Sequence, residues 1–144
     1  MASVSASFLN LDLELESDRD LAPLAEHFGH RAFVLQCNED GGRFHLALEP
    51  LLSGALCGDP TACTDAVLDL IHTLPPALRE LWQQCSVRLF DYGYDGGLEA
   101  PPLTTDIDPV RLGLIAAAGA GIRITLYPFR QSPSAGDNEG DADA

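Results

Sequence analysis

The stretch richest in chemically versatile side chains runs from Asp91 to Glu99 and reads DYGYDGGLE. Carboxylates in a glycine-rich loop are typical of calcium sites, but the EF-hand pattern needs acids two residues apart and here they are four apart. No nucleophile or histidine stands beside these carboxylates in the sequence, so they make a poor general acid–base pair. We therefore expect neither a metal site nor a catalytic centre in this stretch.

Two interpretations of the same stretch remain. In the first it is a tight turn, in which Gly96 and Gly97 supply positive φ angles. In the second it is a recognition loop, in which aromatic side chains supply contact area and carboxylates supply specificity. The second interpretation gives five candidate binding residues, namely Asp91, Tyr92, Tyr94, Asp95 and Glu99.

A second acidic feature lies near the N-terminus, where residues Phe8–Glu16 alternate between apolar and polar side chains. A period of two predicts a β-strand with one buried and one solvated face. Asp12, Glu14 and Glu16 share the solvated face. Their carboxylates either keep the strand from pairing with other chains or form an acidic docking stripe. The docking interpretation adds these three residues to the candidate binding set.

The metal-ligating and nucleophilic residues form no recognisable site. His27 and His30 lack a third ligand, and the cysteines match no zinc spacing, so we expect free thiols, with Cys57 and Cys63 the one pair to test for a bridge. Phosphate-binding, dinucleotide-binding, serine-hydrolase and zinc-protease motifs are absent. The sequence therefore favours a protein without cofactor, metal or catalysis, although a Cys–His pair that meets only in space is not excluded. The four cysteines are Cys37, Cys57, Cys63 and Cys85.

Periodicity places these residues on a frame of strands and helices. Apolar alternation predicts five strands, and helical spacing predicts three helices, the second broken at Pro75-Pro76. The expected elements are a strand at 8–16, a helix at 20–28, strands at 32–37 and 44–48, a broken helix from 59 to 85, a strand at 87–92, a helix from 108 and a strand at 122–127. This order predicts an α+β domain, with a mixed sheet of about five strands and helices mainly on one face. The final strand–helix–strand unit would form a parallel crossover if both strands share the sheet.

Composition limits the classes of partner. The chain has 144 residues, eight arginines, no lysine and 22 acidic residues, for a net charge of −14. Such a field repels phosphate, which argues against general nucleic-acid binding and against docking to anionic membranes. No targeting segment or membrane span is visible, so we expect a cytoplasmic protein.

The acidity divides between a domain and a tail. Residues 1–131 are expected to form a single globular domain, and residues 132–144 a disordered acidic tail of small and polar residues. The tail holds four acidic residues, so a charge of −14 becomes −10 for the domain alone. The negative charge is therefore a property of the folded part.

Three features of residues 65–128 follow one another in a recognisable order. A helical segment (DAVLDLIHTLPPALRELWQQC) precedes a strand, the strand enters an aromatic and glycine-rich turn (LFDYGYDGGLE), and a helix leads through small residues into a closing strand (DPVRLGLIAAAGAGIRITLY). In these features the chain resembles a bacterial family, the domain-of-unknown-function family four-two-seven-nine. The resemblance implies structural roles for Gly96, Gly97 and Tyr127 and supplies no catalytic residues. Some members look like immunity proteins encoded beside toxins.

We therefore expect a non-catalytic protein-binding module, such as an immunity-type inhibitor of a basic toxin, because acidic surfaces speed association with basic partners. The alternative is a small-molecule binder or small enzyme that uses the loop 91–107, since long links without regular structure are often functional. A third hypothesis is a subunit of a homo-oligomer without a separate ligand, and the sequence leaves the oligomeric state open.

Overall fold

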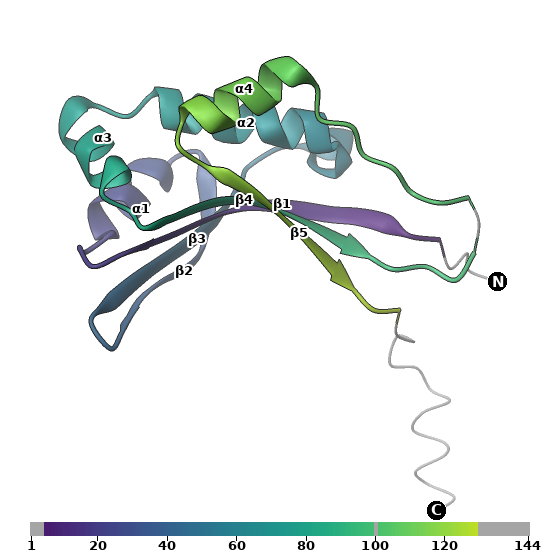
Figure 1. The fold of residues 1–144 in the computed structure, drawn as a ribbon, viewed down its shortest axis with the longest axis horizontal. Helices are drawn as coiled ribbons and strands as arrows, with labels where there is room; N and C mark the ends of the chain where they lie inside the picture. Colours follow the sequence, from purple (N-terminus) through teal and green to yellow (C-terminus); the bar gives the residue numbers. More distant parts are fainter. Residues whose placement is uncertain (1–4, 100, 130–144) are drawn as a thin grey trace, which may run out of the picture.

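The computed structural model describes residues 5–99 and 101–129 of the chain. Over these residues one five-stranded mixed sheet is covered on one face by four α-helices (Figure 1). The expected α+β fold is therefore confirmed. The strands are β1 (Ser7–Ser17), β2 (Ala32–Asp40), β3 (Arg43–Pro50), β4 (Val87–Asp95) and β5 (Gly121–Tyr127). The helices are α1 (Ala22–Phe28), α2 (Pro60–His72), α3 (Pro76–Gln83), α4 (Pro109–Ala117) and the short 3₁₀ helix η1 (Gly54–Gly58).

The N-terminal strand lies at the centre of the sheet, whose strand order is β2-β3-β1-β4-β5. β1 pairs antiparallel with both β3 and β4, and β2 and β3 form an antiparallel hairpin. β4 and β5 run parallel with α4 between them in the chain, which confirms the parallel arrangement expected for this unit. The sheet thus ends in β2 on one side and β5 on the other.

Helix starts follow the local chemistry of the sequence. The Asp59 carboxylate accepts a hydrogen bond from the Thr61 amide, and the Asp108 carboxylate accepts one from the Arg111 amide, so each aspartate caps the helix that follows it. The predicted break between the two central helices is also present, because α2 ends at His72 and α3 begins at Pro76.

The main departure from the expected elements is the length of β4. The strand was expected to end at Tyr92 but continues to Asp95, because Tyr94 and Asp95 pair with Leu126 and Tyr127 of β5. The first five residues of the predicted recognition loop are therefore strand. The prediction that Gly96 and Gly97 adopt positive φ angles is wrong, because neither does. The close approach of the Tyr127 carbonyl explains the glycine at position 96, because an added Cβ would lie 3.1 Å from that oxygen.

The core lies between the sheet and the helices. From β1 it takes Leu11, Leu13 and Leu15, which are at most 1% exposed, and the helices pack Phe28, Val67, Ile71, Trp82 and Ile115 against them. Arg88 of β4 closes one end of this layer, because its guanidinium donates hydrogen bonds to the carbonyls of Trp82, Gln83, Cys85 and Gly119. These carbonyls lie at or beyond the ends of α3 and α4, where helices leave acceptors without partners.

Two expectations concern segments and properties outside this core. The disordered tail expected at residues 132–144 lies outside the described residues. Within the part of the chain that the structure describes, no helix is long and apolar enough to span a membrane.

Candidate functional site

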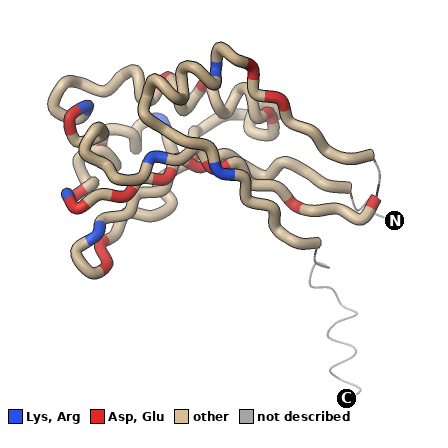
Figure 2. The backbone as a smooth tube through the Cα atoms, viewed as in Figure 1, with Lys and Arg blue, Asp and Glu red and all other residues tan. Residues whose placement is uncertain are grey.

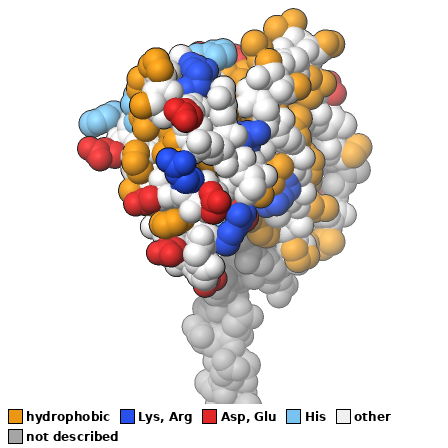
Figure 3. Space-filling view, turned by 60° about the vertical axis from the view of Figure 1, so that its left-hand side comes forward, with side chains coloured by type: hydrophobic (Ala, Val, Ile, Leu, Met, Phe, Trp, Pro, Cys, Tyr) orange, Lys and Arg blue, Asp and Glu red, His pale blue; other side chains and the backbone are white. Residues whose placement is uncertain are grey.

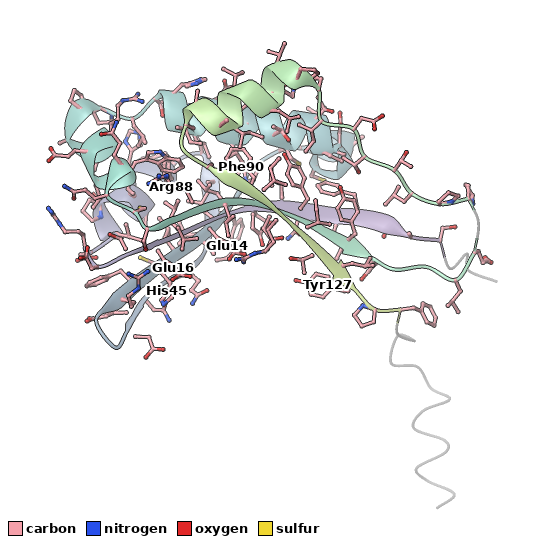
Figure 4. All side chains as sticks on the ribbon, in the orientation of Figure 1. Glu14, Glu16, His45, Arg88, Phe90 and Tyr127 are labelled. Carbon is pink, nitrogen blue, oxygen red and sulfur yellow. The ribbon has the colours of Figure 1, made fainter. Side chains whose placement is uncertain are left out.

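The face of the sheet opposite the helices, here called the open face, carries most of the predicted binding residues. Because side chains alternate along a strand, β1 sends Leu11, Leu13 and Leu15 toward the helices and Asp12, Glu14 and Glu16 to the other side. The register shift between Phe8 and Asn10 leaves Leu9 outside the core, 41% exposed. Figure 4 shows Glu14, Glu16, His45 and Tyr127 on the open face, whereas Phe90 projects toward the helices. The solvated strand face predicted from the sequence is thus the open face of the whole sheet.

Three carboxylates from adjacent strands form a row across the centre of this face. Asp12 of β1 pairs in register with Asp91 of β4. Glu49 of β3 lies one residue beyond the Leu13–Leu48 pair, which brings it beside Asp12. We call Glu49, Asp12 and Asp91 the acid row. Directly opposed side chains on one sheet face have Cβ atoms about 4.5–5.5 Å apart, at which like charges destabilise the sheet.

The crowding of like charges in the acid row affects the pKa of its central residue, Asp12. Burial raises the pKa of Asp12 from 3.8 to about 7, with further increases from the neighbouring Glu49, Asp91 and Glu14 carboxylates. Burial and Asp91 also raise the pKa of Glu14, and Arg123 partly opposes this increase. Near neutral pH the centre of the open face therefore holds negative charge that is poorly compensated.

Cations are present on this face, but they lie beside other carboxylates. Arg123 Nη1 is 3.1 Å from Glu14 Oε1, and Arg43 Nη2 is 3.3 Å from Glu16 Oε1. In the acid row, the Asn10 amide donates to Asp12 Oδ1 and Glu49 Oε2 at 3.3 Å each. Among the described residues, no ion pair reaches the acid row itself.

The other predicted binding residues divide between the rim and the core. Asp95 ends β4 opposite Tyr127, and Glu99 lies beyond the sheet, where its backbone bridges to Ser5. The prediction that Tyr92 and Tyr94 supply surface contact area is wrong, because they are only 0% and 9% exposed. They occupy the positions of β4 that alternate toward the helices, where Tyr92 Oη lies 2.6 Å from Thr64 Oγ1 and the Tyr94 hydroxyl donates to Thr105 Oγ1 at 2.7 Å.

Sequence reasoning missed three residues of the open face. Asn10 lies on the polar side of the predicted first strand, Glu49 lies one residue beyond the predicted end of the third, and Arg123 belongs to the last. Their polar alternation was visible, but their proximity depends on strand order and register. No spacing within the sequence brings residues 10, 12, 49 and 91 together.

A hollow lies near the end of β4 and β5. Its volume is about 490 Å³, and its walls come from the end of the sheet and the segment 103–107. The lining is largely apolar and includes Ala6, Tyr94, Asp95, Gly96, Gly97, Leu103, Thr105, Ile107, Ile124 and Leu126. The predicted loop 91–107 thus contributes most of the wall of a concave site.

The thiols and potential metal ligands do not converge. All four cysteines are free, Cys57 and Cys63 included, and burial raises the pKa of the Cys63 and Cys85 thiols to about 11, which disfavours the reactive thiolate. Across residues 5–99 and 101–129, no group of three or more His, Cys, Asp or Glu side chains is placed to hold a metal ion.

Comparison with known proteins finds no counterpart: no family model, curated protein or solved structure matches the chain. The family resemblance of residues 65–128 therefore stays a prediction, and the function has to be argued from the open face and the hollow themselves.

Proposed function

We propose that the chain is a non-catalytic protein-binding module whose open face takes a basic segment of a partner protein. The observation that carries this proposal is the acid row, Glu49–Asp12–Asp91, on a sheet face that none of the described helices covers. An immunity-type inhibitor of a basic toxin is the form of this function that the acidity and the family resemblance together favour.

A ligand that carries a guanidinium or ammonium group would supply the positive charge that complements the acid row. The pKa of Asp12 is raised to about 7 because its carboxylate is partly desolvated among like charges. A cation placed between Asp12 and its neighbours would lower that pKa again and make charge-assisted hydrogen bonds. Arg123 and Arg43 already bind Glu14 and Glu16 in this way, so the open face accommodates arginine side chains.

Apolar groups on the same face favour a polypeptide over a small cation. Phe33 pairs in register with Glu49 at one end of the acid row and is 60% exposed. Tyr127 lies near the other side, because its ring approaches Gly93 so closely that an added Cβ would be 3.8 Å from Cε2. Exposed aromatic rings flanking a charged centre resemble the anchors of protein interfaces.

Binding should depend on both salt and pH. Exposed charges are screened by salt, so affinity for a basic segment should fall as ionic strength rises. It should also fall below about pH 7, because protonated Asp12 offers no charge to the ligand. Uptake of the cation near neutral pH should therefore release a proton.

The test uses the full chain and an extended arginine-rich peptide, with affinity measured by calorimetry at low and high salt. The double variant Asp12→Asn, Asp91→Asn should weaken binding at least about ten-fold, since each lost charge-assisted bond contributes about 1.5–3 kcal/mol. Asparagine keeps an oxygen that accepts the hydrogen bond now given by Thr125 to Asp91, so the fold should be retained.

The matched control changes the same number of charges on the helical layer. Asp69→Asn with Glu80→Gln removes two exposed carboxylates from α2 and α3. The peptide affinity of this double variant should stay within about two-fold of that of the unaltered chain, because salt screens charges that lie far from the open face. Equal losses in both double variants would mean that the peptide senses only net charge, and the proposal would be wrong.

The hollow of about 490 Å³ supports a second candidate function, that of a small-molecule binder. Its size falls within the range of ligand pockets, and Asp95 is among the residues that line its largely apolar walls, which fits a small apolar amine. Methyl NMR signals of Leu103, Ile124 and Leu126 would shift on binding such an amine. Shifts confined instead to the backbone amide signals of the acid row would assign the amine to the open face and count against the hollow.

A further inference from the structure

β5 lies at one edge of the sheet, and in the described part of the chain no strand pairs with the backbone groups on its outer side. Within the described residues it pairs only with β4. The Tyr127 carbonyl accepts a hydrogen bond from the Gly96 amide at 2.8 Å, so the backbone groups of Tyr127 turn toward the β4 side. Because these groups alternate along a strand, the N–H and C=O groups of Ile122, Ile124 and Leu126 turn outward.

The opposite edge of the sheet has the features that normally prevent strand addition, and β5 does not. β2 has a register shift between Val34 and Gln36 and ends in the charged Glu39 and Asp40. β5 pairs with β4 over seven consecutive residues without a shift, contains no proline, and carries Arg123 as its one charge. Bulges, charges and prolines are the usual means of blocking an edge.

The side chains beside this edge are apolar and exposed. Ile122, Ile124 and Leu126 face the helical side and are 37%, 61% and 66% exposed, and Leu112 of α4 is 43% exposed. Monomeric proteins rarely expose a contiguous apolar patch larger than a few hundred Å², so a row of such side chains is unusual on a free surface. Exposed apolar side chains beside an open strand edge indicate a surface that another polypeptide covers.

The same region is the part of the chain with least negative charge. Residues 109–136 form the longest stretch without Asp or Glu in a chain that has 22 such residues. In Figure 2 the tube through α4 and β5 carries arginine but no acidic residue. Figure 3 shows that on one face of the molecule most acidic side chains gather on the left, whereas the upper and right-hand margins are largely hydrophobic.

We propose that β5 pairs antiparallel with β5 of a second copy of this chain, joining two five-stranded sheets into one continuous sheet. The two-fold axis passes beside Ile124, so that Ile124 faces its counterpart and Ile122 faces Leu126 of the second copy. All three outward-turned residues then exchange both backbone hydrogen bonds with the other strand.

The alternative registers are less favourable for identifiable reasons. An axis beside Arg123 places the two Arg123 side chains opposite each other, which destabilises an antiparallel pair. An axis beside Thr125 pairs Ile122 with Pro128, which has no N–H to donate. With the axis beside Ile124, Arg123 faces Thr125 of the second copy, and no like charges are opposed.

A second copy fits this edge because its own β5 offers the same outward backbone groups and the same apolar flank, and because a contact through the acid-free stretch 109–136 opposes no carboxylates of the two acidic chains. A stable interface needs about 600 Å² or more on each copy, so the apolar side chains beside β5 have to be buried together with its backbone. The two-fold axis stands perpendicular to the sheet, so the two open faces lie side by side. The inference does not depend on the function proposed for the open face.

The test is the mass of the full chain in solution, measured by light scattering and sedimentation from micromolar to about 100 µM. We expect twice the 15.4 kDa of one chain, and we expect the dimer to persist at high salt because its interface is apolar. Ile124→Lys opposes two ammonium groups at the axis and should raise the dissociation constant at least 100-fold. Ile124→Pro should do the same by removing an outward N–H.

Phe33→Lys is the matched control, since it puts the same charge in place of an exposed apolar side chain on the other edge strand. It should stay dimeric, and circular dichroism should show all variants folded. A monomeric wild-type chain at 100 µM, or a dimer that survives both Ile124 substitutions, would overturn the proposal.

Discussion

The same strands make both faces of the sheet, but the two faces affect the stability of the fold in opposite ways. On β1, Leu13 is completely buried under the helices, whereas Asp12, its neighbour, lies in the acid row of the open face. The covered face gains stability from apolar contact, and the open face loses some through crowded carboxylates. This cost fits the binding function proposed for the open face, because a cation bound there would compensate the crowded carboxylates. The predictions below test this contrast, from the largest effect to the smallest.

The largest effect is expected on the covered face. Leu13→Ala should lower the free energy of unfolding by about 3–4 kcal/mol, because it removes buried methyl groups and leaves a cavity. Leu9→Ala, at a position 41% exposed, should cost less than about 1 kcal/mol. Urea unfolding measures both variants, and a similar loss for the two would show that the covered face does not dominate stability.

A smaller loss is expected at the buried hydroxyl pair between α2 and β4. The Thr64 hydroxyl donates to the Pro60 carbonyl at 2.7 Å and lies 2.6 Å from Tyr92 Oη, so Tyr92 is the donor between them. Thr64→Val leaves both Tyr92 and the Pro60 carbonyl without this partner and should cost about 2 kcal/mol, whereas Tyr92→Phe should cost about 1 kcal/mol. Thermal unfolding that ranks the two variants in reverse would contradict this donor assignment.

A substitution in the acid row should raise the free energy of unfolding, whereas the substitutions above lower it. The pKa of Asp12 rises from 3.8 in an unfolded chain to about 7 in the fold, so its ionisation destabilises the fold as the pH rises between these values. Asp12→Asn removes this penalty and should stabilise the chain by about 1–2 kcal/mol above pH 7, after allowance for solvent screening of a partly exposed group.

This gain should shrink as the pH falls and disappear near pH 4, where Asp12 is neutral in both states. Denaturant titrations of both proteins across that range provide the measurement. A gain independent of pH would assign the effect to packing and not to charge.

The smallest effect on stability is expected at the margin of the open face. The Arg123–Glu14 ion pair is partly exposed on both sides, so Arg123→Gln should change the free energy of unfolding by less than about 0.5 kcal/mol. The same change frees the Glu14 carboxylate and should tighten binding of an arginine-rich peptide about two- to five-fold. A weaker affinity would show that Arg123 contributes to binding and does not compete with it.

Much of the frame was readable from local signals. The alternation of Phe8–Glu16 predicted both the strand and the carboxylates of its solvated face, and Asp59-Pro60 and Asp108-Pro109 predicted two helix starts. These signals act between residues close in sequence, so they do not depend on the rest of the fold.

The candidate site was less predictable, because it depends on contacts between distant strands. Tyr92 and Tyr94 looked like surface residues until the extension of β4 beside β5 placed them under the helices. Nothing in the sequence relates Asn10 to Glu49, and they come into contact only because β3 pairs with β1. Prediction failed where pairing over long sequence separation decided which residues met.

The sequence by itself determined an acidic chain, its strand and helix segments, and which side chains share a face of each strand. It did so because periodicity and capping are properties of neighbouring residues. Only the tertiary structure decided the strand order, and with it the acid row of Glu49, Asp12 and Asp91 and the unprotected edge at β5. Both features arise from the register between strands, because the energy of packing the whole core selects that register.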